Sequence, residues 1–141
     1  MEQIKIHFYK ARNGKIGDKI VGLVSVFSHV ELEISGVFYS SSNRDGGVRS
    51  KIINISNKKK WVSFELKNNI DKNICLNYFK SVEGQKYDWL NIFFSQIIKL
   101  NIQSSNKQIC SEFVGNCLQL DNAYKYSPEA LFYKLKELNY I

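Results

Sequence analysis

The sequence predicts an α+β fold in which one antiparallel sheet packs against helices. Three observations carry this prediction. Apolar and polar residues alternate in several stretches up to residue 66, as they do in half-buried strands. From residue 71 onward, apolar residues recur at the three- and four-residue spacing of amphipathic helices. The chain has 141 residues, of which 44% are hydrophobic, so we expect one hydrophobic core and a single domain over residues 1–141.

Five segments of the first half are expected to be strands. Ser35-Gly36 is a turn signal between the second and third of them, so these two should form a hairpin. A loop with two glycines, residues 44–47, follows the hairpin, and three consecutive lysines at 58–60 form the turn between the last two strands. The expected strands are residues 2–10, 29–34, 37–41, 48–55 and 61–66.

Five further segments are expected to be helices, four of them in the second half. Asp18 can cap the first helix. Ser127 and Pro128 are typical of a helix start, with a capping hydroxyl followed by proline at the first helical position. The polar segment 101–108 is expected to be a loop. The expected helices are residues 18–27, 71–82, 88–99, 110–120 and 128–138.

The net charge of +7 favours contact with anionic polymers or surfaces. The basic residues are dispersed, however, and their one tight cluster, residues 58–60, is more typical of a solvated turn than of a nucleic-acid site. We therefore expect no specific nucleic-acid partner. The N-terminus lacks the apolar core of a signal peptide, and no apolar stretch is long enough to span a membrane. These features indicate a cytoplasmic or virion-associated protein.

Cys75, Cys110 and Cys117 are expected to be free thiols. Cys110 and Cys117 share one face of a predicted helix but lie about 10 Å apart along its axis, because each residue rises about 1.5 Å. That separation is too long for a disulfide. Since no cysteines or histidines have the spacing of a zinc site, we expect neither a metal ion nor a cofactor.

Cys110 and His29 are the candidate catalytic pair. Cys110 opens a predicted helix, where unpaired backbone N–H groups and the helix dipole favour a thiolate. His29 opens a strand and can act as the general base of a thiol nucleophile. The only other histidine, His7, lies on a strand with apolar neighbours, and we expect it to have a structural role.

A third residue is needed to orient the histidine, and the sequence leaves two sources open. Glu31 lies two residues after His29 and shares its strand face, and its charge can stabilise an imidazolium. Ser40 or Ser41 can instead approach from the neighbouring strand of the hairpin. Because charge favours the carboxylate, Glu31 is the first choice. Arg44 and Asp45, in the loop after the hairpin, are candidates for contact with a substrate.

Six segments carry a resemblance to a known family: residues 28–32, 38–41, 44–49, 87–90, 109–114 and 127–131. In their order along the chain, they resemble the circularly permuted branch of the NlpC/P60 papain-like superfamily, which includes YiiX/YaeF-type amidases and small phage-encoded proteins. The histidine precedes the cysteine here, whereas the cysteine comes first in papain-like enzymes. The resemblance implies a permuted papain-like fold with a His–polar–Cys site between sheet and helices. It places the nucleophile at Cys110 and the base at His29.

The expected function is that of a cysteine hydrolase that cleaves an amide bond, in a peptidoglycan peptide or a similar small amide. The first alternative is a thioesterase or acyltransferase that uses the same pair on lipid or acyl substrates. The second alternative is a phage structural or binding protein that has the same fold without catalysis, because fold does not determine function.

Overall fold

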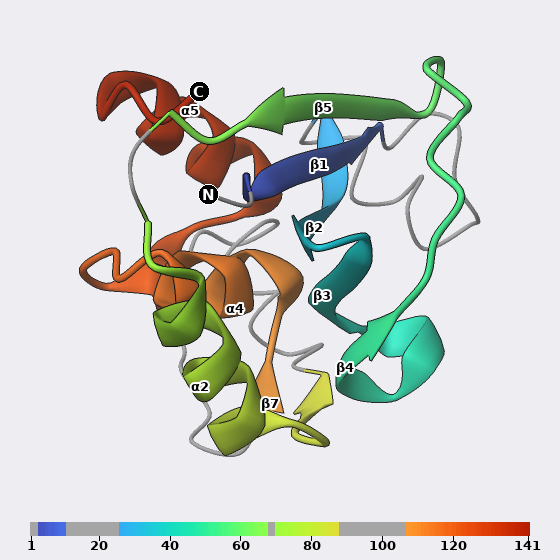
Figure 1. Cartoon of the computed structure of the whole chain (residues 1–141), viewed down its shortest axis with the longest axis vertical. Coiled ribbons are helices and arrows are strands. Elements are labelled where there is room, and N and C mark those ends of the chain that lie inside the picture. The colour runs from blue at the N-terminus through green and yellow to red at the C-terminus, as the bar shows by residue number, and fades with distance from the viewer. Residues whose placement is uncertain (1–2, 11–25, 68–69, 88–106) are drawn as a thin grey trace.

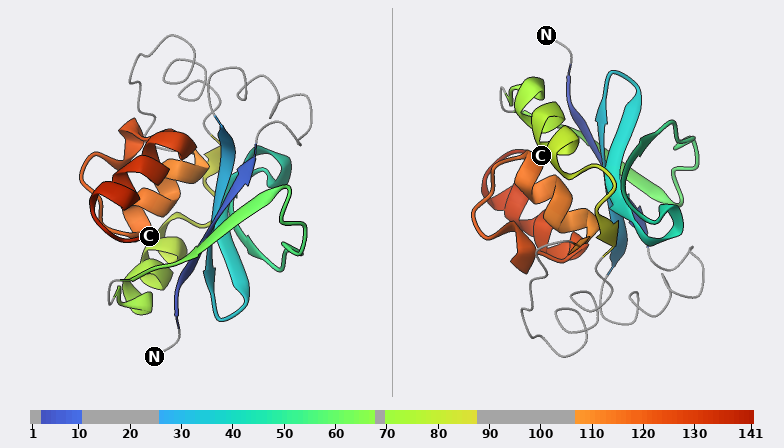
Figure 2. Two further views of the ribbon diagram at one scale, coloured as in Figure 1. Left: turned by 90° about the horizontal axis from the view of Figure 1, so that it is seen from above. Right: turned by 90° about the horizontal axis from the view of Figure 1, so that it is seen from below.

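The structure is a computed structural model that describes residues 3–10, 26–67, 70–87 and 107–141. It is an α+β fold with a five-stranded antiparallel sheet and, among the described residues, three α-helices. The strands are β1 (Lys5–Lys10), β2 (Phe27–Ile34), β3 (Val37–Ser42), β4 (Gly47–Lys51) and β5 (Trp61–Glu65), and the helices are α2 (Lys72–Val82), α4 (Cys110–Cys117) and α5 (Pro128–Glu137). The helices gather on one side of the sheet (Figure 1, Figure 2).

The strand order across the sheet is β4-β3-β2-β1-β5, so the first and second strands of the chain lie at its centre. The hairpin predicted around Ser35-Gly36 joins β2 to β3, and both turn residues have positive φ, as a tight hairpin turn requires. β4 and β5 follow each other in the sequence but lie at opposite edges of the sheet. The lysine turn before β5 therefore belongs to a long connection rather than to a hairpin.

Alternation along the strands separates an apolar face from a polar face. Ile6 and Phe8 of β1 are paired with Leu32 and Val30 of β2, and all four side chains are fully buried in the core. The helices supply the other half of this core, through Phe113 of α4 and several other buried side chains. Those others are Cys75, Phe79, Val82, Val114, Cys117, Leu131 and Leu135.

Local signals account for two of the helix starts. Asp71 accepts a hydrogen bond from the backbone N–H of Asn73 at the start of α2, and Ser127 accepts one from Ala130 at the start of α5. Proline at the first position of α5 fits the sequence prediction. The start of α4 at Cys110 also agrees with the prediction.

Several predicted boundaries are wrong. The fourth strand ends at Lys51 instead of residue 55, and Ile52 beyond it is 83% exposed, so an edge strand stops where its apolar side chain loses contact with the core. α4 ends at Cys117 rather than at residue 120, because Gln119 takes a left-handed backbone conformation with φ of 57°. The first strand begins at Lys5.

The first predicted helix, residues 18–27, is wrong at its end. Phe27 opens β2 instead and is buried in the core. The rest of that predicted helix, apart from residue 26, falls outside the described residues, as does all of the predicted helix at 88–99. The end of the predicted loop at 101–108 contains a short strand. This strand, β7 (Lys107–Gln108), is paired in parallel with β6 (Lys86–Tyr87), and neither has enough residues to show a hydrophobic period.

Candidate functional site

Cys110 is held at the start of α4 by packing on both sides. Ile109 before it and Phe113 after it are fully buried, and the hydroxyl of Ser111 donates a hydrogen bond of 2.5 Å to the carbonyl of Tyr126. The α4 N-terminus has Ile109 at the cap position, which offers no side-chain acceptor to its first N–H groups. Cys110 itself has no exposed surface.

His29 reaches Cys110 from the sheet. The thiol interacts with the imidazole both through charge and through a side-chain hydrogen bond. The pairing of β1 with β2 is irregular at this point, because Tyr9 lies opposite His29 while Lys10 lies opposite Phe27, which leaves Ser28 as the extra residue. Such a bulge redirects nearby side chains, and bulges are common beside active sites. It allows Phe27 to point into the core while His29 remains on the polar side.

The charge of His29 is governed by its neighbours. Burial lowers its pKa, but the negative charges of Cys110 and Glu31 and the hydrogen bonds to them outweigh burial and raise the pKa to about 10 from an ordinary value of 6.5. His29 is therefore an imidazolium at neutral pH. Its Nε2 atom donates to Glu31 Oε1 at 2.6 Å, so Nδ1 is the ring nitrogen that remains for the thiol.

Glu31 is almost completely buried and is held by three hydrogen bonds. Besides His29, it accepts from both terminal nitrogens of Arg49, at 2.7 Å from Nη1 to Oε2 and 2.5 Å from Nη2 to Oε1. Burial alone would raise the pKa of this carboxyl, but the bonds to Arg49 and the charge of His29 lower it below its usual value. Glu31 is thus a carboxylate fixed between two cations.

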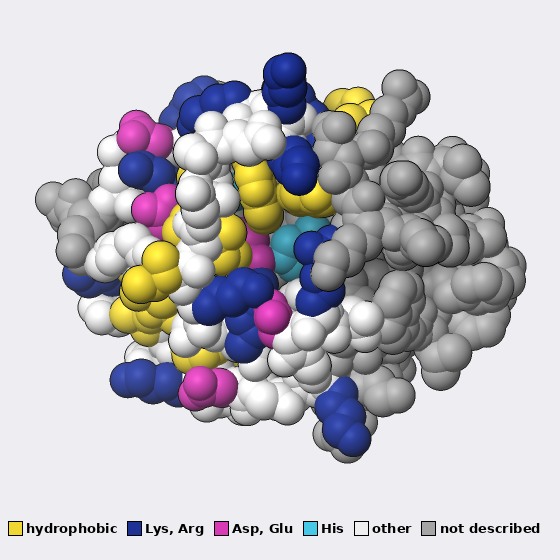
Figure 3. Space-filling view, turned by 90° about the vertical axis from the view of Figure 1, so that its right-hand side faces the viewer, with side chains coloured by type: hydrophobic (Ala, Val, Ile, Leu, Met, Phe, Trp, Pro, Cys, Tyr) yellow, Lys and Arg dark blue, Asp and Glu magenta, His cyan; other side chains and the backbone are white. Residues whose placement is uncertain are grey.

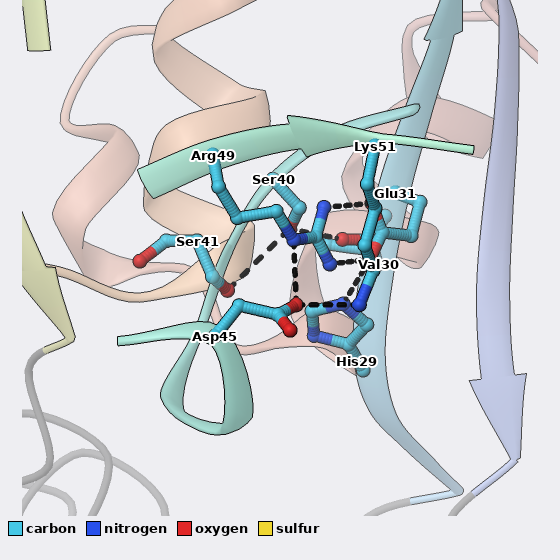
Figure 4. A network of polar contacts seen from close by, with 8 residues as sticks. All are labelled: His29, Val30, Glu31, Ser40, Ser41, Asp45, Arg49 and Lys51. Carbon is cyan, nitrogen blue, oxygen red and sulfur yellow. Dashed lines mark hydrogen bonds and ion pairs between the residues drawn. The ribbon is translucent and has the colours of Figure 1, made fainter. Parts of the chain in front are cut away.

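Arg49 extends this chain of charges to the surface. Its Nε atom donates to Asp45 Oδ2 at 2.7 Å, and Lys51 Nζ donates to the same oxygen at 2.6 Å. Figure 4 shows how the three side chains from β4 and the turn before it converge on Glu31 and His29 of β2. The side chains alternate in sign, from imidazolium through carboxylate and guanidinium to Asp45.

If Ser40 oriented the histidine, its hydroxyl would bind the imidazole of His29, but it has a different partner. It donates to the backbone carbonyl of Val30 at 2.6 Å, and Ser40 is fully buried between β2 and β4. Ser40 is the strand partner of Arg49, and its small side chain leaves room for the guanidinium to cross toward Glu31. Ser41 is also fully buried, and it is the partner of Val48, a core residue.

The two candidates for substrate contact lie in the 3₁₀ turn η2 (Asn43–Asp45). Arg44 is exposed there. Asp45 is bound to Arg49 and Lys51, so its carboxylate is already engaged in the network. In this segment the arginine that donates a hydrogen bond to Asp45 is Arg49.

Arg49 as the partner of Glu31 is the site residue that sequence reasoning missed. Alternation puts it on one face of a strand, but the sequence does not say which residue of β3 lies opposite it. The register that pairs Ser40 with Arg49 brings it within reach of Glu31. The available signal was a glutamate within a predicted strand, because a carboxylate that the fold buries needs a cation or several donors.

One face of the molecule is hollowed (Figure 3). Figure 3 shows histidine and acidic side chains at the floor of a hollow, with hydrophobic side chains on one side and lysine and arginine side chains at its rim. The side chain of His29 is 18% exposed, whereas His7 is 1% exposed. The site therefore presents its imidazole rather than its thiol to solvent.

His7 lies in the middle of β1 and takes no part in this network of hydrogen bonds. Its ring nitrogens are bonded to Ser63 and Glu33, and its ring packs against Phe38 with centroids 5.1 Å apart. Burial lowers the pKa of His7 more than Glu33 raises it. The two histidines thus have opposite charge preferences.

Within the described part of the chain, no group of three or more His, Cys, Asp or Glu side chains is arranged to hold a metal ion. All three cysteines are free thiols, as predicted. No helix in the described ranges has both the length and the apolar composition needed to cross a membrane. Comparisons with protein-family models, with curated proteins and with solved structures found no match to this chain.

Proposed function

We propose that this protein is a cysteine hydrolase of amide bonds with a permuted papain-like arrangement. Cys110 is the nucleophile, His29 the general base and acid, and Glu31 the residue that orients the histidine. The observation that carries the proposal is the direct sequence of contacts from thiol to imidazole to buried carboxylate. Nucleophile, base and orienting group in this relation are the parts of a nucleophilic triad.

The resting site supplies a cation, His29, beside the nucleophile. An imidazolium beside a cysteine favours the thiolate, which is the reactive form of the side chain. Cys110 Sγ attacks the amide carbon, and the backbone N–H groups at the start of α4 stabilise the oxyanion that forms. His29 then protonates the departing amine from Nδ1. Water, deprotonated by His29, hydrolyses the acyl-enzyme and restores the thiolate.

Glu31 and Arg49 support this cycle without contact to the reacting atoms. Glu31 accepts from Nε2 of His29, which fixes the ring orientation and stabilises its positive charge. Arg49 holds Glu31 by two parallel hydrogen bonds, a geometry specific to guanidinium and carboxylate. The imidazole therefore keeps one orientation during proton transfer.

One observation favours the non-catalytic alternative. Cys110 has no exposed surface, so a substrate reaches Sγ only if the atoms that cover it move apart. A binding protein on this fold would need no such movement, and its Cys110–His29–Glu31 chain would serve stability. Activity assays separate the two functions.

The experiment is a comparison of defined substrates with matched variants. The wild-type protein is incubated with muropeptide amides, acyl-thioesters and phospholipids. We expect amide hydrolysis that falls at least about 10³-fold in Cys110→Ala and in His29→Ala, because removing either member disables the triad. Cys117→Ala is the control, since it removes a thiol from the other end of the same helix.

Circular dichroism verifies that each variant is folded. Hydrolysis that persists in Cys110→Ala contradicts the proposed nucleophile. Cleavage of the thioester or lipid without cleavage of the amide identifies the acyltransfer alternative. No turnover of any substrate, with all variants folded, favours the binding protein.

A further inference from the structure

A second cluster of catalytic residue types lies on the polar face of the sheet, apart from Cys110. His7 of β1 stands between Ser63 of β5 and Glu33 of β2. Its Nδ1 atom is 2.7 Å from Ser63 Oγ, and its Nε2 atom is 2.7 Å from Glu33 Oε2. The proposed cysteine mechanism uses none of these three residues.

The hydrogen bonds fix where the protons lie. A carboxylate is only an acceptor, so the bond between His7 and Glu33 requires a proton on Nε2 of the ring. Burial lowers the pKa of His7 from 6.5, so the ring is neutral at pH 7 and its Nδ1 carries a lone pair. The hydroxyl of Ser63 therefore donates to Nδ1. A serine hydroxyl that donates to a carboxylate-bound neutral imidazole is the arrangement of a serine nucleophile.

The position of Ser63 makes it accessible. β5 is an edge strand, and Ser63 is exposed while His7 behind it is buried. Hydrogen bonds join residue 10 to residue 60 and residue 66 to residue 4 in the ladder of β1 and β5. Because bonded and non-bonded pairs alternate, the pair of His7 and Ser63 is a non-bonded one.

Two consequences follow from that register. Side chains of non-bonded pairs lie closer together, which explains the short contact between Ser63 and His7. The backbone N–H of Ser63 points away from β1, toward the outer edge of the sheet, where no strand of the described residues is paired with β5. This amide is a donor beside the nucleophile, on the side from which a substrate would approach.

We infer that Ser63, His7 and Glu33 form a second acyl-transfer site at this edge, which accepts small activated acyl donors such as esters. Ser63 Oγ bonds to the acyl carbon, its proton passes to His7 Nδ1, and the ester C–O bond breaks as that proton is delivered to the departing oxygen. Water then cleaves the acyl-serine by the same proton route and releases the acid. Glu33 stabilises the transient imidazolium, and the Ser63 amide faces the oxyanion.

A purely structural role would produce the same resting hydrogen bonds, since a buried histidine needs partners for both ring nitrogens. The two roles differ in the reactivity of Ser63. A hydroxyl served by a general base reacts roughly 10²-fold or more faster with an electrophile than an ordinary serine does.

The experiment is covalent labelling of the full chain with a fluorophosphonate. The serine oxygen bonds to phosphorus and fluoride leaves, while the serine proton passes to His7 and then to water. Adducts are located by peptide mass spectrometry. We expect modification of Ser63 at least about 10²-fold faster than that of Ser50, an exposed serine on the other edge strand. Ser63→Ala should remove the adduct, and Ser50→Ala should leave it unchanged.

Glu33→Gln should slow labelling of Ser63 by 10-fold or more, which keeps the test valid if variants of the buried His7 do not fold. Labelling in Cys110→Ala should equal that of the wild type, which separates this site from the cysteine site. Modification of Ser63 no faster than that of Ser50, or unaffected by Glu33→Gln, overturns the inference.

Discussion

At the scale of single residues, the site depends on the spacing of two neighbours on one strand. His29 and Glu31 are two positions apart, and strand geometry places them on the same face, so the sequence alone predicted that they could meet. Their hydrogen bond of 2.6 Å agrees with that geometry. The clamp by Arg49 could not be predicted in the same way, because it depends on the register between strands rather than on the pattern within one.

Replacement of Glu31 tests its role as the orienting residue. Glu31→Gln removes the negative charge beside His29 and the carboxylate that accepts from both terminal nitrogens of Arg49, so we expect turnover to fall about 10²-fold or more. Ser40→Ala is the matched control, because its hydroxyl is bonded to the Val30 carbonyl and not to the imidazole. A larger loss of activity in Ser40→Ala than in Glu31→Gln would show that the assignment of the third residue is wrong.

The protonation of His29 gives a prediction that needs no substrate. Its pKa is raised to about 10, so its ring should remain protonated through neutral pH, whereas His7, with a lowered pKa, should be neutral there. A raised pKa in the folded state stabilises the protein fully below the ordinary value of 6.5 and loses this contribution as pH rises toward 10. Histidine ring resonances in NMR report both titrations.

The His29 resonance should shift in the alkaline range, and the midpoint of that shift should move to lower pH in Glu31→Gln. The groups that act on it are Cys110 and Glu31, both of which raise its pKa. A pKa of His29 near 6.5 would show that Cys110 and Glu31 do not raise it as described. Urea unfolding at several pH values measures the same pKa shift through the free energy of unfolding. The part of the pH dependence that is lost in His29→Gln is the contribution of His29.

At the scale of elements, the charge network depends on how β4 is held in place. Gly47 opens β4 with φ of 140°, and a Cβ atom there would lie 1.8 Å from the carbonyl oxygen of Gln85. The same backbone oxygen accepts a hydrogen bond from Val48 at 2.8 Å. The turn after α2 is therefore packed directly on the start of the strand that carries Arg49.

Gly47→Ala should destabilise the fold by about 2 kcal/mol or more, because it adds a clash with rigid backbone to a strained conformation. Gly46→Ala separates these two causes, since Gly46 also has positive φ but a Cβ there meets no atom within 4 Å. We expect Gly46→Ala to cost about 1 kcal/mol. Urea unfolding measures both, and equal losses in the two variants would contradict the close packing of Gly47 against Gln85.

Element types could be predicted from periodicity and caps, but several boundaries could not. Asp71 and Ser127 mark the starts of their helices as N-cap residues, because each side chain accepts a backbone hydrogen bond. The end of α4 had no such signal, since Gln119 adopts positive φ without being glycine. The pair of β6 and β7 was not predicted because two-residue strands are set by tertiary contacts alone.

At the scale of the whole molecule, the order of strands decides which residues can meet. The sequence indicated five strands but not that β4 and β5 occupy opposite edges. Because of that order, Arg49 reaches Glu31 across β3 from one side, and Ser63 reaches His7 from the other. The two histidines, on neighbouring strands of one sheet, thus have separate partners and opposite charge preferences.

The central claim is that Cys110 is a nucleophile activated by His29, and its alkylation rate tests this most directly. The full chain is treated with iodoacetamide at pH 6.5, and each cysteine is followed by mass spectrometry. Cys75 and Cys117 are internal controls, since both are buried thiols in the core and neither histidine is among the groups that act on their pKa. We predict that Cys110 is alkylated at least about 10-fold faster than either control, and that His29→Ala abolishes the difference because the group that activates the thiol is then absent. Alkylation of Cys110 as slow as that of Cys75 and Cys117, and unchanged in His29→Ala, would contradict the claim.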